Sequence, residues 1–410
     1  FQRTRRCIYR SCKCTLNELM LEKNKKEIMT LGGYDYYLVV LFLIMVSIGL
    51  VMVASASISN AEEVFNNPFY YFFNQGMSVF LGLIFLLLFL KIPTSYLQTS
   101  SRVLLFTSIA LLVFTLIPGV GKEVNGSTRW IELGGKSFQA AEFVKFFIVT
   151  YFAGYLVNFR ESVQSELKGF LKPILILSLI SLLLLKQPDY GSCAVLSITI
   201  LGMLFLAGVP LWRFILWLPL FAITLFSLII FSPYRMERLI SFLDPWQDCN
   251  NIGYQLCQAL IGFGRGDWAG VGLGSGIQKL FYLPENHTDF IFSVLAEELG
   301  LIGAISIILL YFFLVWRTFS IGRIAESAKN YFSAYLAYGI GLIIGIQAYI
   351  NIGVNMGALP TKGLTLPFIS YGANSMIVYC ILFGVLMRIE YENRHTVRTT
   401  NRKSVPAYAE

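Results

Sequence analysis

The stretch LPENHTDFIFSVLAEELGLIGAISIILLYFFLVW, residues 283–316, places polar and charged residues at the entrance of a long apolar run. The apolar run is long enough to cross a membrane as a helix, which takes about 20 residues. Charged groups are costly inside a membrane, so the His, the Asp and the three Glu of this stretch need a reason. Two interpretations are open: the polar residues cap the helix, or they carry out chemistry.

Apolar segments of similar length recur along the whole chain of 410 residues. Charged residues make up only 14% of the sequence, whereas a soluble domain carries about 25%. We therefore predict an all-α polytopic membrane protein with ten transmembrane helices. The predicted spans lie near residues 35–54, 70–90, 102–118, 138–157, 170–187, 189–208, 212–231, 288–316, 334–354 and 365–388.

The Lys and Arg residues predict the orientation, because basic residues gather in the short cytoplasmic segments of membrane proteins. With the N-terminus in the cytoplasm, 22 of the 32 basic residues fall on the cytoplasmic side and nine on the outer side. Both termini are then cytoplasmic, and the one large loop, 232–287, lies outside between spans seven and eight. The net charge of +8 is thereby explained without nucleic acid as a partner.

The ends of the chain differ from its middle. Residues 1–33 hold eight basic residues and no apolar span. We expect them to be a basic cytoplasmic arm that is either disordered or not native. Residues 34–390 form the membrane domain, and 391–410 form a cytoplasmic tail.

One predicted span carries charge inside the membrane. Glu142 and Lys145 lie one turn apart on the same helical face. They either form a structural ion pair or line a polar cavity that opens outward. Arg129 and Trp130 precede them in a predicted outer loop. The planar guanidinium of Arg129 and the ammonium group of Lys145 would together suit the oxygens of a pyrophosphate.

The ninth predicted span carries three amides, Gln347, Asn351 and Asn355, at spacings of four residues. This spacing puts them on one face of a helix, where the pattern favours hydrogen bonds to neighbouring helices.

The seven cysteines are odd in number and contain no paired CxxC motif. This pattern argues against a disulfide or metal scaffold. Cys249 and Cys257 share the long outer loop, but the pattern does not favour a bond between them.

The polar entrance at 285–289 fits both interpretations in part. Thr288 or Asn286 is a suitable N-cap, and Asp289 would then lie in the first turn, where the helix N-terminus keeps it ionised. A cap does not explain Glu285 and His287 as well. A carboxylate at a water-exposed helix entrance is placed to act as a general base, so we interpret Asp289 as catalytic.

Four long motifs resemble a known family. They are MERLISFLDPW (236–246), GYQLCQALIGFGRGDWAGVGLG (253–274), QKLFYLPENHTDFIFSVLAEELGLIG (278–303) and INIGVNMGALPTKGLTLPFISYGANS (350–375). Their order and wording resemble the SEDS family of shape, elongation, division and sporulation proteins, and the division branch more than the elongation branch. The resemblance covers about residues 34–390. Two short motifs depart from it, with QAAE in place of QPSE and SYGANS in place of SYGGSS.

The resemblance implies ten helices with cytoplasmic termini and a peptidoglycan glycosyltransferase activity. Such an enzyme polymerises lipid II into β-1,4 glycan strands, with inversion, on the outer face of the cytoplasmic (inner) membrane at the division site. The family's essential acid corresponds to Asp289. We expect substrate to be bound by Arg129, Trp130, Glu142, Lys145, Glu285, His287 and Thr288, whereas Glu297 and Glu298 are expected to be structural.

The resemblance also implies partners and leaves alternatives open. We expect lipid II, membrane lipids, a class B penicillin-binding protein and other divisome proteins as partners. A divalent cation, Mg²⁺ or Mn²⁺, is expected without identified ligands, and no organic cofactor is expected. The alternative functions are a lipid II flippase and a non-catalytic scaffold that activates a transpeptidase.

Overall fold

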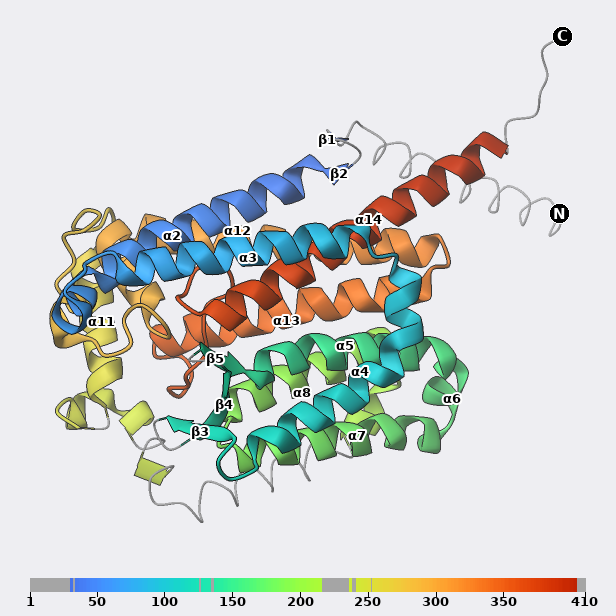
Figure 1. The fold of residues 1–410 in the computed structure, drawn as a ribbon, viewed down its shortest axis with the longest axis horizontal. Helices are drawn as coiled ribbons and strands as arrows, with labels where there is room; N and C mark the ends of the chain where they lie inside the picture. Colours follow the sequence, from blue (N-terminus) through green and yellow to red (C-terminus); the bar gives the residue numbers. More distant parts are fainter. Residues whose placement is uncertain are drawn as a thin grey trace, which may run out of the picture.

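A computed structural model describes residues 30–31, 34–124, 127–133, 136–215, 236–237, 241–251 and 253–403. Within these residues, eight helices are long and apolar enough to cross a membrane, and they run side by side as a bundle (Figure 1). They are α2 (Tyr36–Phe65), α3 (Tyr70–Lys91), α4 (Thr94–Thr115), α5 (Ala140–Asn158), α7 (Leu167–Lys186), α12 (Ile291–Ser327), α13 (Tyr331–Asn355) and α14 (Ala373–Lys403). The shorter apolar helix α8 (Tyr190–Leu206) belongs to the same bundle.

These helices coincide with nine of the ten predicted spans. The seventh predicted span, 212–231, lies almost wholly outside the described residues, as does most of the arm 1–33. The tenth span begins later than predicted, because α14 starts at Ala373, and it continues without interruption to Lys403. Both ends of the described chain lie at the same end of the bundle (Figure 1).

The prediction of an all-α protein overlooked two small sheets. A three-stranded antiparallel sheet, in the order β3 (Gly121–Val124), β4 (Ser127–Leu133) and β5 (Lys136–Gln139), joins α4 to α5. The strands are linked by Asn-Gly and Gly-Gly dipeptides, which are typical of hairpin turns. A hairpin of β1 (Thr30–Leu31) and β2 (Tyr34–Asp35) precedes α2.

The central helices carry the polar residues of the interior. In α5, α13 and α14 most of the apolar stretch is buried, whereas α3, α4, α7 and α12 turn many apolar side chains outward. Outward apolar side chains suit contact with lipid. Charged and amide groups on α5 and α13 therefore face protein rather than lipid.

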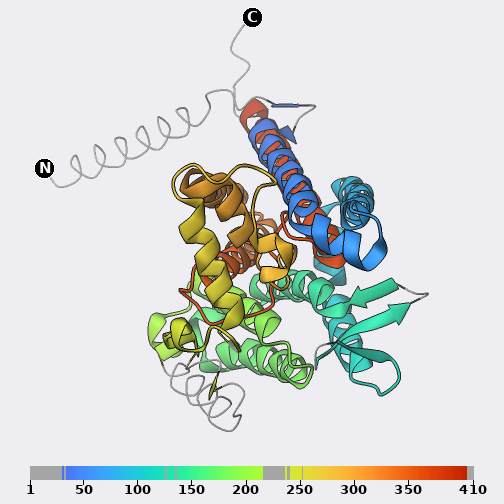
Figure 2. The same cartoon turned by 90° about the vertical axis from the view of Figure 1, so that its left-hand side faces the viewer.

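Four short elements complete the described chain. These are α6 (Arg160–Ser165), η1 (Pro245–Asp248), α11 (Tyr254–Gly266) and η2 (Gln278–Tyr282). Helix α11 lies crosswise to the spanning helices at the end of the bundle that also holds the end of α2 (Figures 1 and 2).

The longest helix, α12, is interrupted at Gly300, where φ is +67° and ψ is −169°. A Cβ at this position would lie 2.3 Å from the amide nitrogen of Gly270, so the close approach requires glycine. The loop after α11 enters the break and exchanges backbone hydrogen bonds with α12. These run from Val271 N to Glu297 O (3.0 Å), Gly272 N to Glu298 O (3.1 Å), Leu301 N to Asp267 O (2.9 Å) and Ile302 N to Trp268 O (3.2 Å).

Two buried carboxylates hold the same loop from inside α12. Glu297 accepts hydrogen bonds from Arg265 at 2.9 Å and from the amides of residues 277 and 278 at 3.0 and 3.1 Å. Glu298 is paired with Lys279 at 2.8 Å and accepts a hydrogen bond from Ser55 of α2. The structural interpretation of both glutamates is confirmed. Removing one partner would leave a buried charge unpaired, which is strongly destabilising.

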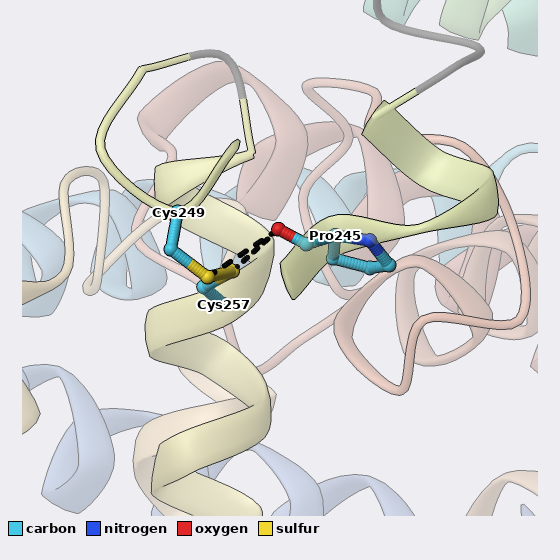
Figure 3. Close-up of a disulfide and its surroundings, with 3 residues drawn as sticks. All are labelled: Pro245, Cys249 and Cys257. Atoms are coloured by element: carbon cyan, nitrogen blue, oxygen red, sulfur yellow. Dashed lines mark hydrogen bonds between the residues drawn. A yellow bond between two sulfur atoms is a disulfide. The ribbon is translucent and has the colours of Figure 1, made fainter. Parts of the chain in front are cut away.

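A disulfide between Cys249 and Cys257 links the loop after η1 to the first turns of α11 (Figure 3). The sequence pattern did not favour this bond, so that interpretation was wrong. The carbonyl oxygen of Pro245 lies 2.9 Å from Sγ of Cys257 and 3.3 Å from Sγ of Cys249. Disulfides persist in oxidising compartments, and this one therefore supports an extracytoplasmic position for the loop.

The disulfide predicts how the cysteines respond to a membrane-impermeant maleimide applied to intact spheroplasts. Without reductant, Cys249 and Cys257 should not react. After mild reduction both should be labelled from outside if their loop is extracytoplasmic as predicted, while the buried Cys193 and Cys380 stay unlabelled. A gel shift of the tagged protein measures this, with the Cys249→Ser, Cys257→Ser double variant as control. Labelling that requires permeabilised membranes would contradict the orientation.

Candidate active site

Asp289 lies on the turn between η2 and α12, two residues before the helix begins at Ile291. Two amides of α13 hold this turn through its backbone. Asn351 and Asn355 donate to the carbonyl of Asp289 at 2.8 and 2.9 Å. Asn355 also accepts from the amide and hydroxyl of Ser293, at 3.1 and 2.8 Å. The predicted bond to a neighbouring helix is thus confirmed for Asn355, which contacts Ser293 of α12, whereas Asn351 bonds to backbone outside the helices. Together they fix the segment that carries Asp289.

The carboxylate of Asp289 faces a backbone without a side chain. A Cβ built on Gly363 would lie 2.9 Å from Oδ2 of Asp289. Asn351 holds this second segment as well, since it donates to the carbonyl of Leu364 at 2.6 Å. Asn351 of α13 therefore positions both the turn that carries Asp289 and the backbone segment at residues 363–364 beside it.

The surroundings of Asp289 favour its neutral form. Its pKa is raised to about 7, mainly by desolvation on burial and also by the carboxylate of Glu285, while Arg129 lowers it. The side chain nevertheless keeps some exposure to solvent. The prediction that the helix N-terminus keeps Asp289 ionised was wrong, because burial outweighs the helix dipole here. A carboxyl with a pKa near 7 is well matched to general base catalysis at neutral pH.

Thr288 does not cap α12. The N-cap position is Phe290, which makes no side-chain cap bond. The hydroxyl of Thr288 donates instead to Oε2 of Glu285 at 2.7 Å, and Glu285 is exposed with a left-handed φ of 54°. The hydrogen bond between these two side chains stabilises the turn and does not cap the helix.

His287 is buried between two tyrosines. Its ring lies 4.5 Å from that of Tyr71 and 5.6 Å from that of Tyr371, and its carbonyl accepts from the amide of Tyr371 at 2.9 Å. Nδ1 is 3.1 Å from Oδ1 of Asn286. Burial lowers the pKa of His287 below its usual value, so the ring is neutral and supports the turn by packing.

Arg129 reaches the site from strand β4. It donates to the carbonyl of Pro188 at 2.5 Å and lies 3.9 Å from Asp189, which caps α8 by accepting from the amide of Ser192. Its positive charge lowers the pKa of Asp289, against the effect of burial. Trp130 lies beside it in β4, half-buried, with backbone partners in β3 and β5.

Glu142 and Lys145 form the predicted ion pair, with 2.9 Å between Nζ and Oε1. Lys145 also donates to Gln347 at 2.6 Å, and Gln347 donates to the carbonyl of Thr365 at 2.9 Å. The two charged residues are only 3% and 2% exposed. The pair therefore lies inside the bundle, and the expected outward cluster of Arg129 with Lys145 is not formed.

Sequence reasoning missed Gly363, which lies against Asp289, and three residues around the turn that Arg129 contacts, Asp189, Tyr190 and Lys362. Lys362 places its Nζ 4.9 Å from the ring of Tyr190. The signal was present in the phrase LPTKGLTLP, where a bare glycine follows a lysine in an otherwise apolar outer segment.

Comparisons with known proteins agree with this architecture. The model of the FtsW/RodA/SpoVE family, described as cell cycle protein, matches residues 35–395. The chain belongs to this family.

Individual relatives cover most of the chain. The probable peptidoglycan glycosyltransferase FtsW of Coxiella burnetii is 50% identical over 88% of this chain and 98% of its own length. The protein of the same name from Allochromatium vinosum is 49% identical over 87% and 89%.

Two solved structures share the fold. A chain of a peptidoglycan synthase complex is 27% identical, with a TM-score of 0.72 over 88% of this chain and 98% of that chain. The rod shape determining protein RodA of Thermus thermophilus is 26% identical, with a TM-score of 0.65 over 88% and 97%.

One departure from the family motifs has a visible consequence. In the motif SYGANS, Asn374 donates to the carbonyl of Ser137 in β5 at 3.0 Å. The side chain that replaces the family's small residue thus ties the start of α14 to the outer sheet.

Gly363→Ala tests the close approach to Asp289. The added methyl group meets the carboxylate, which must rotate away, while the backbone of residue 363 needs no left-handed φ. We expect a fall in turnover of about 10-fold or more, because small displacements of a catalytic group have large effects. Turnover by purified protein and its melting temperature measure this, with Gly76→Ala as control, since a Cβ there meets nothing within 4 Å. Wild-type turnover would show that the contact is irrelevant.

Proposed function

We propose that the chain polymerises lipid II into β-1,4 glycan strands, as a peptidoglycan glycosyltransferase of the division branch of its family. The observation that carries the proposal is Asp289, a partly exposed carboxyl on a turn held by Asn351 and Asn355 against the bare backbone of Gly363. The relatives at about 50% identity that bear the name peptidoglycan glycosyltransferase FtsW support the same activity.

In the proposed reaction, Asp289 accepts the proton of the acceptor's 4-hydroxyl as that oxygen attacks C1 of the donor sugar. The new O4–C1 bond forms while the bond from C1 to the pyrophosphate oxygen breaks. The electron pair of that bond leaves with undecaprenyl pyrophosphate. Attack from the opposite face converts the α-linked donor into a β-1,4 bond.

The other site residues support this step in distinct ways. We assign Arg129 to the negative charge that develops on the leaving group, and Trp130 to the sugar or lipid that passes beside it. Glu285, His287 and Thr288 shape the turn that presents Asp289. Glu142 and Lys145 act at a distance, by holding Gln347 of α13 and the backbone at Thr365.

A divalent cation remains part of the proposal, bound mainly by the substrate. Among the described residues, no group of three His, Cys, Asp or Glu side chains is arranged to hold a metal ion. Mg²⁺ commonly binds through one or two carboxylates together with substrate phosphates. We therefore expect Mg²⁺ or Mn²⁺ to enter with the pyrophosphate, and no step above depends on it.

We also propose the topology that the reaction needs. Ten spans with both termini in the cytoplasm put Asp289 and the 232–287 loop on the outer face of the inner membrane. The disulfide in that loop and the common position of the two described chain ends support this orientation.

A class B penicillin-binding protein is the proposed partner, with the division site as location. The likeness to a chain of a synthase complex that coordinates polymerization and crosslinking supports such a partnership. Contacts with other divisome proteins and with membrane lipids belong to the same proposal.

Asp289→Asn tests the activity. The amide keeps the shape of the carboxyl and cannot accept the proton, so polymerisation should fall by about 10²–10⁴-fold. Glycan chains formed from purified lipid II by protein in nanodiscs measure this, with and without the partner and a chelator. Polymerisation at the wild-type rate would contradict the assignment of Asp289.

The same preparation distinguishes the two alternative functions. A flippase would move labelled lipid II across vesicles without forming chains. A scaffold would support growth of cells whose only copy carries Asp289→Asn.

The pH profile of polymerisation provides an independent test. Asp289 works as a base only when deprotonated, and its pKa is raised to about 7. The rate should therefore be half-maximal near pH 7, level off above it, and fall about tenfold for each pH unit well below it. His287 does not produce this transition, because burial lowers its pKa. A rate that stays constant down to pH 5 would contradict the role of Asp289.

A further inference from the structure

We propose that Arg129 and Lys362 together form a binding site for the pyrophosphate of the polyprenyl-linked donor. The inference rests on the proposed function, because it names the groups that receive the leaving group of that reaction. It replaces the pairing of Arg129 with Lys145 that the sequence favoured.

Both cations contact the turn 188–190, although they come from segments far apart in the chain. Arg129 donates to the carbonyl of Pro188 at 2.5 Å and lies 3.9 Å from Asp189. Lys362 places Nζ 4.9 Å from the ring of Tyr190, the next residue of the same turn. Arg129 comes from strand β4, whereas Lys362 precedes α14, so the fold brings them together at the start of α8.

This turn also lies beside the proposed base. Gly363, the neighbour of Lys362, is the residue whose backbone leaves room for Oδ2 of Asp289. In the transition state, the attacking acceptor oxygen and the departing pyrophosphate oxygen are both partly bonded to C1 of the donor sugar. The general base and the groups that bind the pyrophosphate must therefore lie close together.

Arg129 has unused capacity for a ligand. Within the described part of the chain, its buried Nε makes no hydrogen bond. The guanidinium side chain is 25% exposed, so a ligand at the outer surface reaches it. A planar fork with a neighbouring ammonium group matches the oxygens of a pyrophosphate.

Lys145 is unsuited to this role. Its ammonium group is 2% exposed and is already engaged by Glu142 and Gln347 at 2.9 and 2.6 Å. A pyrophosphate that reached it would have to enter the centre of the bundle and break a buried ion pair. The acids near the proposed site are Asp289, the exposed Glu285 and Asp189, which lies 3.9 Å from Arg129.

The charge balance of the reaction gives the site its function. As the C1–O bond breaks, its electron pair moves onto the pyrophosphate oxygen, which gains negative charge. Two fixed cations stabilise that charge without having to reorganise. Because they lie at the outer end of the bundle, the product can then leave laterally into the membrane.

The test uses farnesyl pyrophosphate as the probe and the full chain in nanodiscs, in the Asp289→Asn background so that no turnover occurs. Lys362→Met should raise the Kd of the probe about tenfold, the effect of losing one charge-assisted hydrogen bond. Lys362→Arg should retain binding, and farnesol, which lacks the pyrophosphate, should show no difference between variants. Lys362→Gln replaces the Met variant if the latter does not fold, as judged by its melting temperature.

Lys186→Met is the matched control. Lys186 is exposed and lies two residues before the same turn, so Lys186→Met removes an equal charge close to the proposed site. An unchanged Kd in Lys362→Met, or an equal rise in Lys186→Met, would overturn the site. The proposed function fails on a different result, namely polymerisation at the wild-type rate by Asp289→Asn. That result would not change the measured Kd values of the probe.

Discussion

The fold depends on how the backbone amides and carbonyls at the break in α12, at Gly300, find hydrogen-bond partners. A membrane offers no water to the amides and carbonyls that a broken helix exposes, so protein must supply their partners. The loop after α11 does so with its own backbone, and the buried carboxylates Glu297 and Glu298 fix it through Arg265 and Lys279. Because the loop is fastened to the helix in this way, the outer part of α12 and the turn before it keep one position relative to the bundle.

That fixed turn gives the site its chemical character. Asn351 and Asn355 bind its carbonyl from α13, and Gly363 leaves room for the carboxylate. The packing needed for this positioning also removes water from Asp289, and desolvation raises its pKa toward neutrality. The same contacts that orient the acid thus set the pH at which it can act as a base. Precise placement and a suitable pKa are two results of one arrangement.

Patterns with a clear physical period were predictable from the sequence. Apolar length identified the spanning helices, and the spacing of Gln347, Asn351 and Asn355 identified a bonding face of α13. The position of Asp289 directly before a spanning helix followed from the apolar length of that helix.

Features that depend on contacts distant in sequence were not predictable. The Cys249–Cys257 bond depends on how the loop returns to α11, and the bareness of Gly363 matters only because Asp289 lies against it. Thr288 looked like a cap because local sequence cannot show that Glu285 would take its hydroxyl. The most direct test of the account is a structure with an unreactive lipid II analogue bound as acceptor. If Asp289 is the general base, the acceptor's 4-hydroxyl oxygen lies about 2.6–3.2 Å from its carboxylate, or is joined to it by one water. A 4-hydroxyl held beside a different carboxylate, with Asp289 out of reach, would contradict it.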